Sequence, residues 1–426
     1  MTAREAALKA LSGCRRGEFS EEAINKAVNA ACLDERDSAL CSRIVYTSLQ
    51  NETLLDLYIG KYSSVAVKRL EPRVLDILRL SAAQMLFMDR IPHSAAVSEG
   101  VELCRKAGLS RAGGLVNAVL RRISENAGDQ PELPERGTPE YLAARYSHPL
   151  WLASELCAER GYEFTEAFFA ANNTEPPIFA QTNTLRTDAD ALALKLRARG
   201  VEVGEGSLPG SLILRGAGRP DALPEFGEGL FYIQDEAARR AVETAGIAPG
   251  MTVLDACAAP GGKSFAAAML LRGSGEIIAC DVSEKKLARI RSGAERLGVG
   301  NISVRAMDAR SPDAALREAA DVVIADAPCS GLGVIRKKPE IRRKTREENA
   351  PLPEIQLSIL EGLAQCVKRG GTLLYSTCTV LRRENGDVAA EFVSRHPEFS
   401  IDSAADFWPH IHQTDGFFVC RMIRSK

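Results

Sequence analysis

The 426-residue sequence lacks the long apolar segments that would place a chain in a membrane or direct it out of the cell. Nowhere does an uncharged apolar run approach the roughly 20 residues that span a bilayer. The N-terminal stretch carries charged side chains at Arg4, Glu5 and Lys9 and has no continuous apolar core, so it does not look like a secretion signal. We therefore expect a cytoplasmic protein.

The eleven cysteines lack the spacing of a metal site. No Cys-x-x-Cys pair occurs, and no histidine stands beside a cysteine at the spacing that zinc ligands need. We therefore predict no metal site, and we expect no disulfides in a reducing compartment. Most of these cysteines are expected to be small buried hydrophobic residues. Any proposed catalytic cysteine has to be argued against that simpler interpretation.

An excess of charge of either sign is also missing, because the net charge is only −2. No global field therefore draws the chain to nucleic acid or to a membrane, and any such attraction has to come from local patches. An apolar fraction of 45% and a charged fraction of 26% are typical of a soluble globular protein. The length predicts about two or three domains.

The first part of the chain follows a helical pattern. Between Pro72 and Met88 the apolar residues fall mainly on one helical stripe, and proline suits the first turn of a helix. Ser94 is a candidate N-cap for the next helix, which we expect to stop at Gly108. A further helix is predicted over residues 114–123. These elements predict a compact all-helical domain.

A linker and a mixed segment follow the helical region. Residues 128–139 contain three prolines and almost no apolar side chains. From about residue 141 to 227, strand-like and helical stretches alternate, which predicts an α+β module. The predicted organisation is a helical domain over 1–126, a linker over 127–139, an α+β module over 140–235 and a catalytic domain over 236–426.

Beyond Gln234 the chain alternates strands with helices, which predicts a doubly wound parallel sheet. Residues 353–367 are predicted as the helix that returns the chain to this sheet after its central strand. The last strands, which end near residue 423, are expected to close the edge of the sheet as an antiparallel hairpin.

Two strands of this predicted sheet end beside a cysteine. The apolar run from Asp321 to Ala325 is followed by Asp326 and Cys329, and the stretch GTLLYSTC ends at Cys378. Ligands of open parallel sheets bind outside the carboxyl ends of the strands. Two thiols at that edge suggest covalent chemistry.

A glycine turn follows the first strand of this half, where Gly261 and Gly262 precede a predicted helix. Such a turn lets a ligand approach the backbone closely. A phosphate-binding loop would need glycine in place of Cys257, and a dinucleotide-binding G-x-G-x-x-G is absent. The remaining interpretation is an S-adenosylmethionine site.

The ends of the next two strands support that interpretation. Asp281 ends the second strand, where a carboxylate is well placed to accept hydrogen bonds from both ribose hydroxyls. Asp308 ends the third strand, where a carboxylate could accept the adenine amino group. A single strand-end aspartate often only caps a helix, but carboxylates at successive strand ends argue for a ligand.

Longer strings resemble known families. HSAAVSEGVELCRKAG and GGLVNAVLRRI resemble the NusB family of small helical RNA-binding domains over about residues 1–125. YSHPLWL, QTNTLRTD and FYIQDEAA resemble the RNA-contacting region that precedes the catalytic domain of RNA cytosine methyltransferases. The later half resembles the RNA cytosine-carbon-5 methyltransferases through LDACAAPGGKS, CDVSEKKL, MDARSP, DAPCSGLGVIRKKPEIR, YSTCTVLRREN and DGFFVCRMI, in that order.

The resemblance implies a fold and an activity. It implies an all-α NusB-like domain, an α+β module and a Rossmann-like class I methyltransferase domain. It also implies S-adenosylmethionine as cofactor and methylation of carbon 5 of a cytosine in 16S ribosomal RNA. A transfer RNA cytosine methyltransferase and a non-catalytic RNA-binding assembly factor are the alternatives.

The resemblance further implies roles for single residues. Cys378 of the TC motif corresponds to the nucleophile, and Cys329 of the PC motif to the group that assists breakdown of the adduct. In DNA cytosine methyltransferases the PC cysteine attacks instead, so spacing alone leaves the two roles reversible. Asp326 could bind the edge of the cytosine. The implied cofactor site comprises Cys257, Ala258, Ala259, Pro260, Gly261, Gly262, Lys263, Asp281, Asp308 and Asp326.

A basic run lies between the two cysteine motifs. Residues 336–346 hold seven basic side chains and one acidic side chain, and the run begins seven residues after Cys329. Charged runs are usually solvated, but this position favours contacts with RNA phosphates.

Overall fold

The computed structural model describes residues 1–425, and its contacts divide them into two units. Unit 1 comprises residues 1–174 together with 335–345, and unit 2 comprises residues 175–334 and those from 346 onward. The predicted combination of an all-helical part, an α+β module and an α/β domain with a largely parallel sheet is confirmed. The four predicted ranges do not coincide with these units, and their boundaries stay predictions.

Unit 1 is helical throughout its described length. Its α5 begins at the predicted Pro72. The predicted cap at Ser94 is wrong, because α6 begins one residue earlier and has Pro92 in extended conformation at its N-cap. The helices are α1 (Ala3–Arg15), α2 (Ser20–Ala31), α3 (Glu35–Gln50), α4 (Glu52–Tyr62), α5 (Pro72–Phe87), α6 (His93–Lys106), α7 (Gly113–Glu125), α8 (Pro139–Tyr146), α9 (Leu150–Arg160) and α10 (Tyr162–Asn172).

A segment that is distant in sequence completes unit 1. Residues 335–345 contain the short 3-10 helix η6 (Pro339–Arg343), and Arg342 within it is 8% exposed. Its guanidinium donates hydrogen bonds to backbone carbonyls and to one side-chain amide oxygen. Because a guanidinium offers five N–H donors in a rigid plane, it can satisfy several buried carbonyls at once. The acceptors are the carbonyls of Gln50, Tyr146, Ser147 and Asn172 and Oδ1 of Asn173.

Replacement of Arg342 by methionine is therefore expected to destabilise unit 1. Methionine keeps much of the apolar length but leaves the buried carbonyl acceptors unpaired, which should cost about 3 kcal/mol or more. Urea unfolding followed by circular dichroism would measure this loss, with Arg121→Met on an exposed surface of α7 as the control. An unchanged unfolding midpoint would show that water satisfies these carbonyls equally well.

Unit 2 contains a small antiparallel sheet. The strand order is β2-β3-β1-β4, and every neighbouring pair is antiparallel. The helix α11 (Ala189–Ala198) packs its buried leucines against this sheet. The elements are β1 (Ile178–Thr182), β2 (Glu202–Glu205), β3 (Ser211–Arg215), α12 (Pro224–Gly227) and β4 (Phe231–Ile233).

A seven-stranded sheet forms the rest of unit 2, in the order β10-β11-β9-β8-β5-β6-β7. The five strands from β9 to β7 in this order are parallel to one another. The predicted antiparallel hairpin of β10 and β11 pairs with β9 and closes that edge of the sheet. The strands are β5 (Thr252–Asp255), β6 (Glu276–Asp281), β7 (Ile302–Ala306), β8 (Ala320–Asp326), β9 (Val367–Thr377), β10 (Phe399–Phe407) and β11 (Phe417–Arg424).

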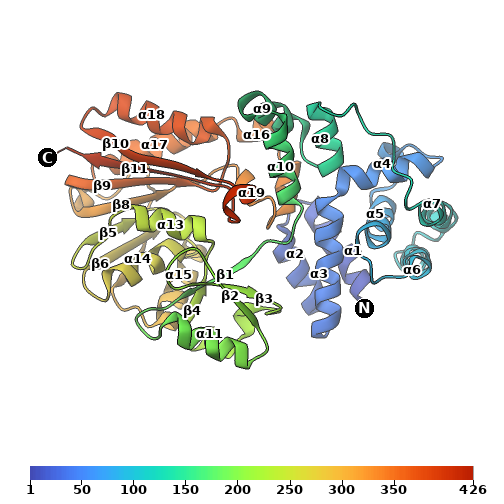
Figure 1. Ribbon diagram of the computed structural model, residues 1–426, viewed down its shortest axis with the longest axis horizontal. Coiled ribbons are helices and arrows are strands. Elements are labelled where there is room, and N and C mark those ends of the chain that lie inside the picture. Colours follow the sequence, from blue (N-terminus) through green and yellow to red (C-terminus); the bar gives the residue numbers. More distant parts are fainter. Residues whose placement is uncertain (426) are drawn as a thin grey trace. The chain divides into compact units, whose positions relative to one another are not determined.

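Both faces of this sheet are buried, which explains the continuous apolar run in β8 (Figure 1). Successive side chains of a strand point to opposite faces, so Val322 and Ile324 pack on one side and Val323 and Ala325 on the other. Helices α13 (Glu236–Thr244), α14 (Gly262–Leu271) and α15 (Glu284–Leu297) cover the first face, and α17 (Leu352–Ala364) and α18 (Gly386–Arg395) cover the second. The predicted return helix between β8 and β9 is α17.

Within residues 1–425, no helix has the length and apolar composition to cross a membrane.

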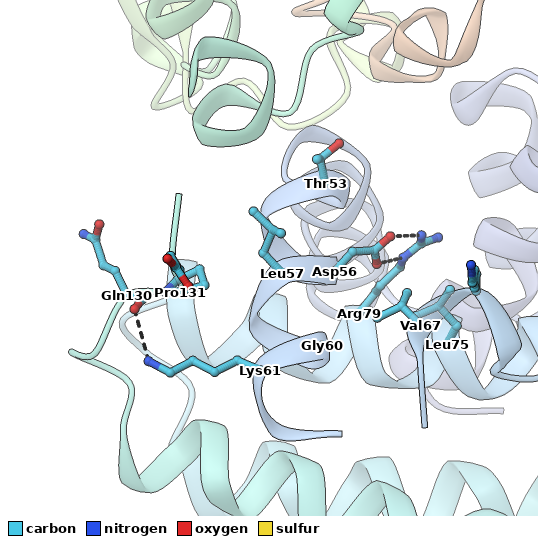
Figure 2. Close-up of a pocket in the computed structure, with 12 residues that line it drawn as sticks. Thr53, Asp56, Leu57, Gly60, Lys61, Val67, Leu75, Arg79, Gln130 and Pro131 are labelled. Carbon is cyan, nitrogen blue, oxygen red and sulfur yellow. Dashed lines mark hydrogen bonds and ion pairs between the residues drawn. The ribbon is translucent and has the colours of Figure 1, made fainter. Parts of the chain in front are cut away.

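A cavity of about 1010 Å³ lies in unit 1 between α4, α5 and residues 130–132. Figure 2 shows Arg79 paired with Asp56 at its wall and Lys61 bonded to the carbonyl of Gln130. The residues that line the cavity include no cysteine. It therefore offers none of the nucleophiles predicted from the sequence.

Candidate active site

The two cysteines lie at the same edge of the seven-stranded sheet. Strands β8 and β9 are parallel neighbours, and Asp326 pairs in register with Ser376. Cys329 and Cys378 follow these two positions, and their sulfur atoms are 3.3 Å apart. Neither cysteine is in a disulfide, and both are partly exposed. The structure thus brings together the two residues for which the sequence predicted covalent chemistry.

The surroundings of Cys329 disfavour its ionisation. The hydrogen bond with Cys378 raises the pKa of the Cys329 thiol well above its usual range, and burial raises it further. The carboxylates of Glu384 and Asp326 act in the same direction, because a nearby negative charge disfavours a second one. The Cys329 thiol therefore retains its proton in this arrangement.

Asp326 is held at the end of β8 by two partners. Lys263 contacts one carboxylate oxygen at 2.7 Å, and the Ser376 hydroxyl donates a hydrogen bond of 2.8 Å to the other. The ammonium of Lys263 also lies 5.0 Å from the centre of the Phe417 ring. Lys263 belongs to the first turn of α14, so this ion pair connects the glycine turn with the strand end that precedes Cys329.

The glycine turn has a conformation that side chains would obstruct. Gly261 has φ of 114°, and a Cβ atom there would lie 2.6 Å from the Phe265 ring. The turn is closed by hydrogen bonds from the Gly261 N–H to the Ala258 carbonyl and from the Ala258 N–H to the Cys280 carbonyl. Ala259, Pro260 and Gly262 belong to the same turn, whose Ala259–Pro260 bond is cis. A ligand can approach the backbone at the start of α14.

Two carboxylates lie beside this turn. Asp281 at the end of β6 is 8% exposed, and one of its oxygens accepts the Ser283 N–H. Asp255 at the end of β5 is fully buried and accepts a hydrogen bond of 2.6 Å from the Ser264 hydroxyl. Burial raises the pKa of Asp255 to about 7, in spite of the Ser264 hydrogen bond. Burial likewise raises the pKa of the Cys257 thiol, which lies within the turn.

Asp308 differs from the other predicted cofactor ligands. It lies two residues beyond β7 and forms an ion pair of 2.7 Å with Arg310, which is its neighbour in the same loop. Both side chains are largely exposed. The arginine lowers the pKa of Asp308, which is therefore ionised and already has a hydrogen-bond donor.

The prediction that the basic run binds phosphate is wrong for Arg342. Its guanidinium donates to buried carbonyls in unit 1, as described above, because a buried guanidinium needs acceptors and the helical unit supplies them. Arg336 is also only 5% exposed. Arg343 forms an ion pair of 2.7 Å with Glu52, and phosphate binding by this exposed residue stays a prediction.

Sequence reasoning missed three polar residues that hold the cysteine turns: Gln356, Ser376 and Glu384. Ser376 stands two residues before Cys378 and pairs in register with Asp326, so its position carried a signal. Gln356 in α17 and Glu384 after β9 are completely buried. No local motif of the sequence indicates that they meet at Cys329.

Known families and proteins are similar to this chain over nearly its whole length. A family model described as 16S rRNA methyltransferase RsmB/F matches residues 246–423, the NusB family matches 1–125, and an RsmF/B-like ferredoxin-like domain matches 148–219. Ribosomal RNA small subunit methyltransferase B of Pseudomonas putida is 32% identical over 441 residues, which cover 100% of this chain and 99% of that protein.

The chain belongs to this family of methyltransferases.

Solved structures agree with the family in fold. The crystal structure of PH0851 matches with a TM-score of 0.85 and 28% identity, and the match covers 100% of this chain and 98% of that chain. The structure of NSun6 from Pyrococcus horikoshii with SFG has a TM-score of 0.58 and 21% identity, and it covers 68% of this chain and 98% of that one. The latter likeness concerns the fold alone.

S-adenosylmethionine is the cofactor of this methyltransferase family, and the residues present fit it. The turn needs glycine at position 261, where a Cβ atom would collide with the Phe265 ring, and its backbone leads directly into the N-terminus of α14, where N–H groups can bind an adenosyl group. The nearly buried carboxylate of Asp281 is one acceptor for ribose hydroxyls at the neighbouring strand end. Among residues 1–425, no group of three or more His, Cys, Asp or Glu side chains could hold a metal ion.

Proposed function

We propose that this methyltransferase modifies carbon 5 of a cytosine in RNA, with 16S ribosomal RNA as its substrate, through a covalent bond between Cys378 and the base. The observation that carries the proposal is the pair of thiols 3.3 Å apart at the ends of β8 and β9. Lys263 and Asp326 connect this pair to the cofactor turn. The names of the family and of its relatives support ribosomal RNA as the substrate.

Two thiols suit this reaction because carbon 5 of cytosine is a poor nucleophile. Attack of the Cys378 thiolate on carbon 6 forms a carbon–sulfur bond and moves the ring electrons toward carbon 5. Covalent attachment thus replaces one difficult step by two easier ones. S-adenosylmethionine, when bound, supplies an electrophilic methyl group for carbon 5. The base has to leave its stack to reach the thiol, since both faces of the ring are involved.

Release of the product needs the second thiol. The proton on carbon 5 has to leave, and the electrons of that C–H bond then expel the Cys378 thiolate from carbon 6. The sulfur of Cys329 lies 3.3 Å from the reacting sulfur. We therefore assign to Cys329 the role of the base that takes this proton.

The direct test is identification of the product. Purified protein, S-adenosylmethionine and 16S ribosomal RNA are incubated, and the RNA is digested to nucleosides for mass spectrometry. We expect 5-methylcytidine, and we expect none with transfer RNA. Methylation of transfer RNA alone would assign the chain to the alternative substrate. Absence of any product with either RNA, together with no binding of S-adenosylmethionine, would favour an RNA-binding assembly factor.

Replacement of Asp281 by alanine is expected to weaken binding of S-adenosylmethionine by about tenfold or more. The substitution removes a charged acceptor, whose hydrogen bonds contribute about 1.5–3 kcal/mol. Isothermal titration calorimetry measures this without RNA, and Asp402→Ala on β10 is a control carboxylate paired with Arg421. Equal affinity of the Asp281 variant and the unchanged protein would remove Asp281 from the cofactor site.

A further inference from the structure

Two neighbouring residues, Glu384 and Asn385, contact the turns that carry the two thiols. They lie between β9 and α18, and their side chains are 0% and 2% exposed. The two side chains bond to different cysteine turns. The chain therefore connects both turns through one buried dipeptide.

Glu384 and Gln356 hold the backbone on both sides of Cys329. One oxygen of Glu384 accepts the Ser330 N–H at 2.8 Å, and the same oxygen accepts a hydrogen bond of 3.1 Å from Gln356. The Gln356 amide also donates to the Pro328 carbonyl at 3.0 Å. Hydrogen bonds to a carboxylate are about twice as strong as neutral ones. The turn is thus fixed immediately before and after the cysteine.

Asn385 bonds to the residues on both sides of Cys378, to the side chain of Thr377 and to the backbone of Thr379. Its side-chain oxygen accepts a hydrogen bond of 2.6 Å from the Thr377 hydroxyl, and its NH₂ group donates to the Thr379 carbonyl at 3.2 Å. The hydroxyls of Thr379 and Ser330 are 2.6 Å apart and bond to each other. The residues that directly follow the two cysteines are therefore also joined.

We propose that Glu384 and Asn385 are positioning residues that set the distance between the Cys329 and Cys378 sulfur atoms, Glu384 through the Cys329 turn and Asn385 through the Cys378 turn. The inference rests on the proposed covalent reaction for its kinetic consequences. Its geometric consequence, a close dithiol, is independent of any RNA.

The two substitutions should have different kinetic signatures, which a general loss of stability would not produce. Glu384→Ala frees the Cys329 turn, so the first bond to RNA still forms but the adduct is resolved about 10- to 100-fold more slowly. Asn385→Ala frees the Cys378 turn, so the adduct itself forms more slowly by a similar factor. Glu384→Gln retains an acceptor for the Ser330 N–H, and it should restore resolution to near the original rate.

The kinetic experiment measures covalent protein–RNA complex on denaturing gels after rapid mixing with 16S ribosomal RNA and S-adenosylmethionine. The control is Asp321→Ala, because Asp321 is another carboxylate of unit 2 that accepts a backbone N–H, that of Thr252, and it lies at the opposite end of β8 from the cysteines. This control should show no accumulated complex. Accumulation in Asn385→Ala but not in Glu384→Ala would reverse the assignment, and identical uniform slowing in both would overturn it.

A second measurement needs no RNA and tests the geometry directly. Phenylarsine oxide bridges two thiols only when both sulfurs reach one arsenic atom, so its binding reports the effective concentration of one thiol beside the other. We expect Glu384→Ala and Asn385→Ala to weaken this binding at least about tenfold relative to Asp321→Ala, with Cys329→Ala as the non-bridging reference. Unchanged arsenical binding would overturn the positioning role. If the two variants bind the arsenical more weakly but the unaltered protein forms no adduct with RNA, the positioning role stands and the proposed reaction is wrong.

Discussion

Cys378→Ala is expected to abolish methylation of RNA, with a fall in turnover of about four orders of magnitude. The substitution removes the sulfur that has to bond to carbon 6, and water at this position cannot replace a thiolate. Transfer of a radiolabelled methyl group from S-adenosylmethionine to 16S ribosomal RNA measures the loss. Binding of the cofactor, followed by calorimetry, should stay near that of the unaltered protein.

A second cysteine variant serves as the control for Cys378→Ala. Cys366 is buried directly before β9 and belongs to the hydrophobic core, so Cys366→Ala should cost stability but leave the chemistry intact. If Cys378→Ala kept full activity while Cys329→Ala lost it, the two thiols would have exchanged roles. The spacing of the motifs allows that exchange.

The meeting of the two cysteines could be predicted because it depends only on strand ends. Parallel strands of one sheet present their carboxyl ends at one edge, and each of the two cysteines follows an apolar run that reads as a buried strand. The residues at these ends, Asp326 and Ser376, are in fact in register. What the pattern could not supply was the 3.3 Å separation of the sulfur atoms, or the hydrogen bond by which Glu384 holds the turn after Cys329.

Contacts between distant segments escaped prediction. The interpretation of Arg342 as a phosphate ligand failed because its acceptors lie between residues 50 and 173, and only the folded helices bring their carbonyls together. Asp308 shows the opposite case, since Arg310 is two residues away and competes locally with any ligand. Composition and spacing do not reveal which side chain already pairs with a candidate ligand, or which distant carbonyls will accept hydrogen bonds from an arginine. The predicted strand-end aspartate without such a competitor, Asp281, is the stronger cofactor candidate.

The ion pair of Lys263 with Asp326 was predicted in part: its two residues were, but their contact was not. Both residues were predicted for the cofactor site, but separately, as parts of a glycine turn and of a strand end. Their contact at 2.7 Å follows from the order of the sheet, in which β8 lies beside β5. The sequence order of the strands does not reveal that adjacency.

Cys329→Ala is expected to accumulate a covalent complex between the protein and methylated RNA. Cys378 can still attack and carbon 5 can still be methylated, but the group placed to take the carbon-5 proton is missing. Turnover should fall by about 10²- to 10⁴-fold, the usual contribution of a positioned base. Denaturing electrophoresis would show a protein band that is retarded by bound RNA. The amount of this retarded protein should approach the total amount of enzyme.

The double variant Cys329→Ala/Cys378→Ala decides what this complex means. If Cys378 forms the bond to the base, the double variant cannot form the complex, whereas a contaminating crosslink through another cysteine would persist. Nuclease digestion and mass spectrometry of the trapped protein should place the attached nucleotide on Cys378. Rapid release by Cys329→Ala at the unaltered rate would mean that another base removes the proton, and Asp326 would be the next carboxylate to test because its pairing with Lys263 keeps it beside the same strand end.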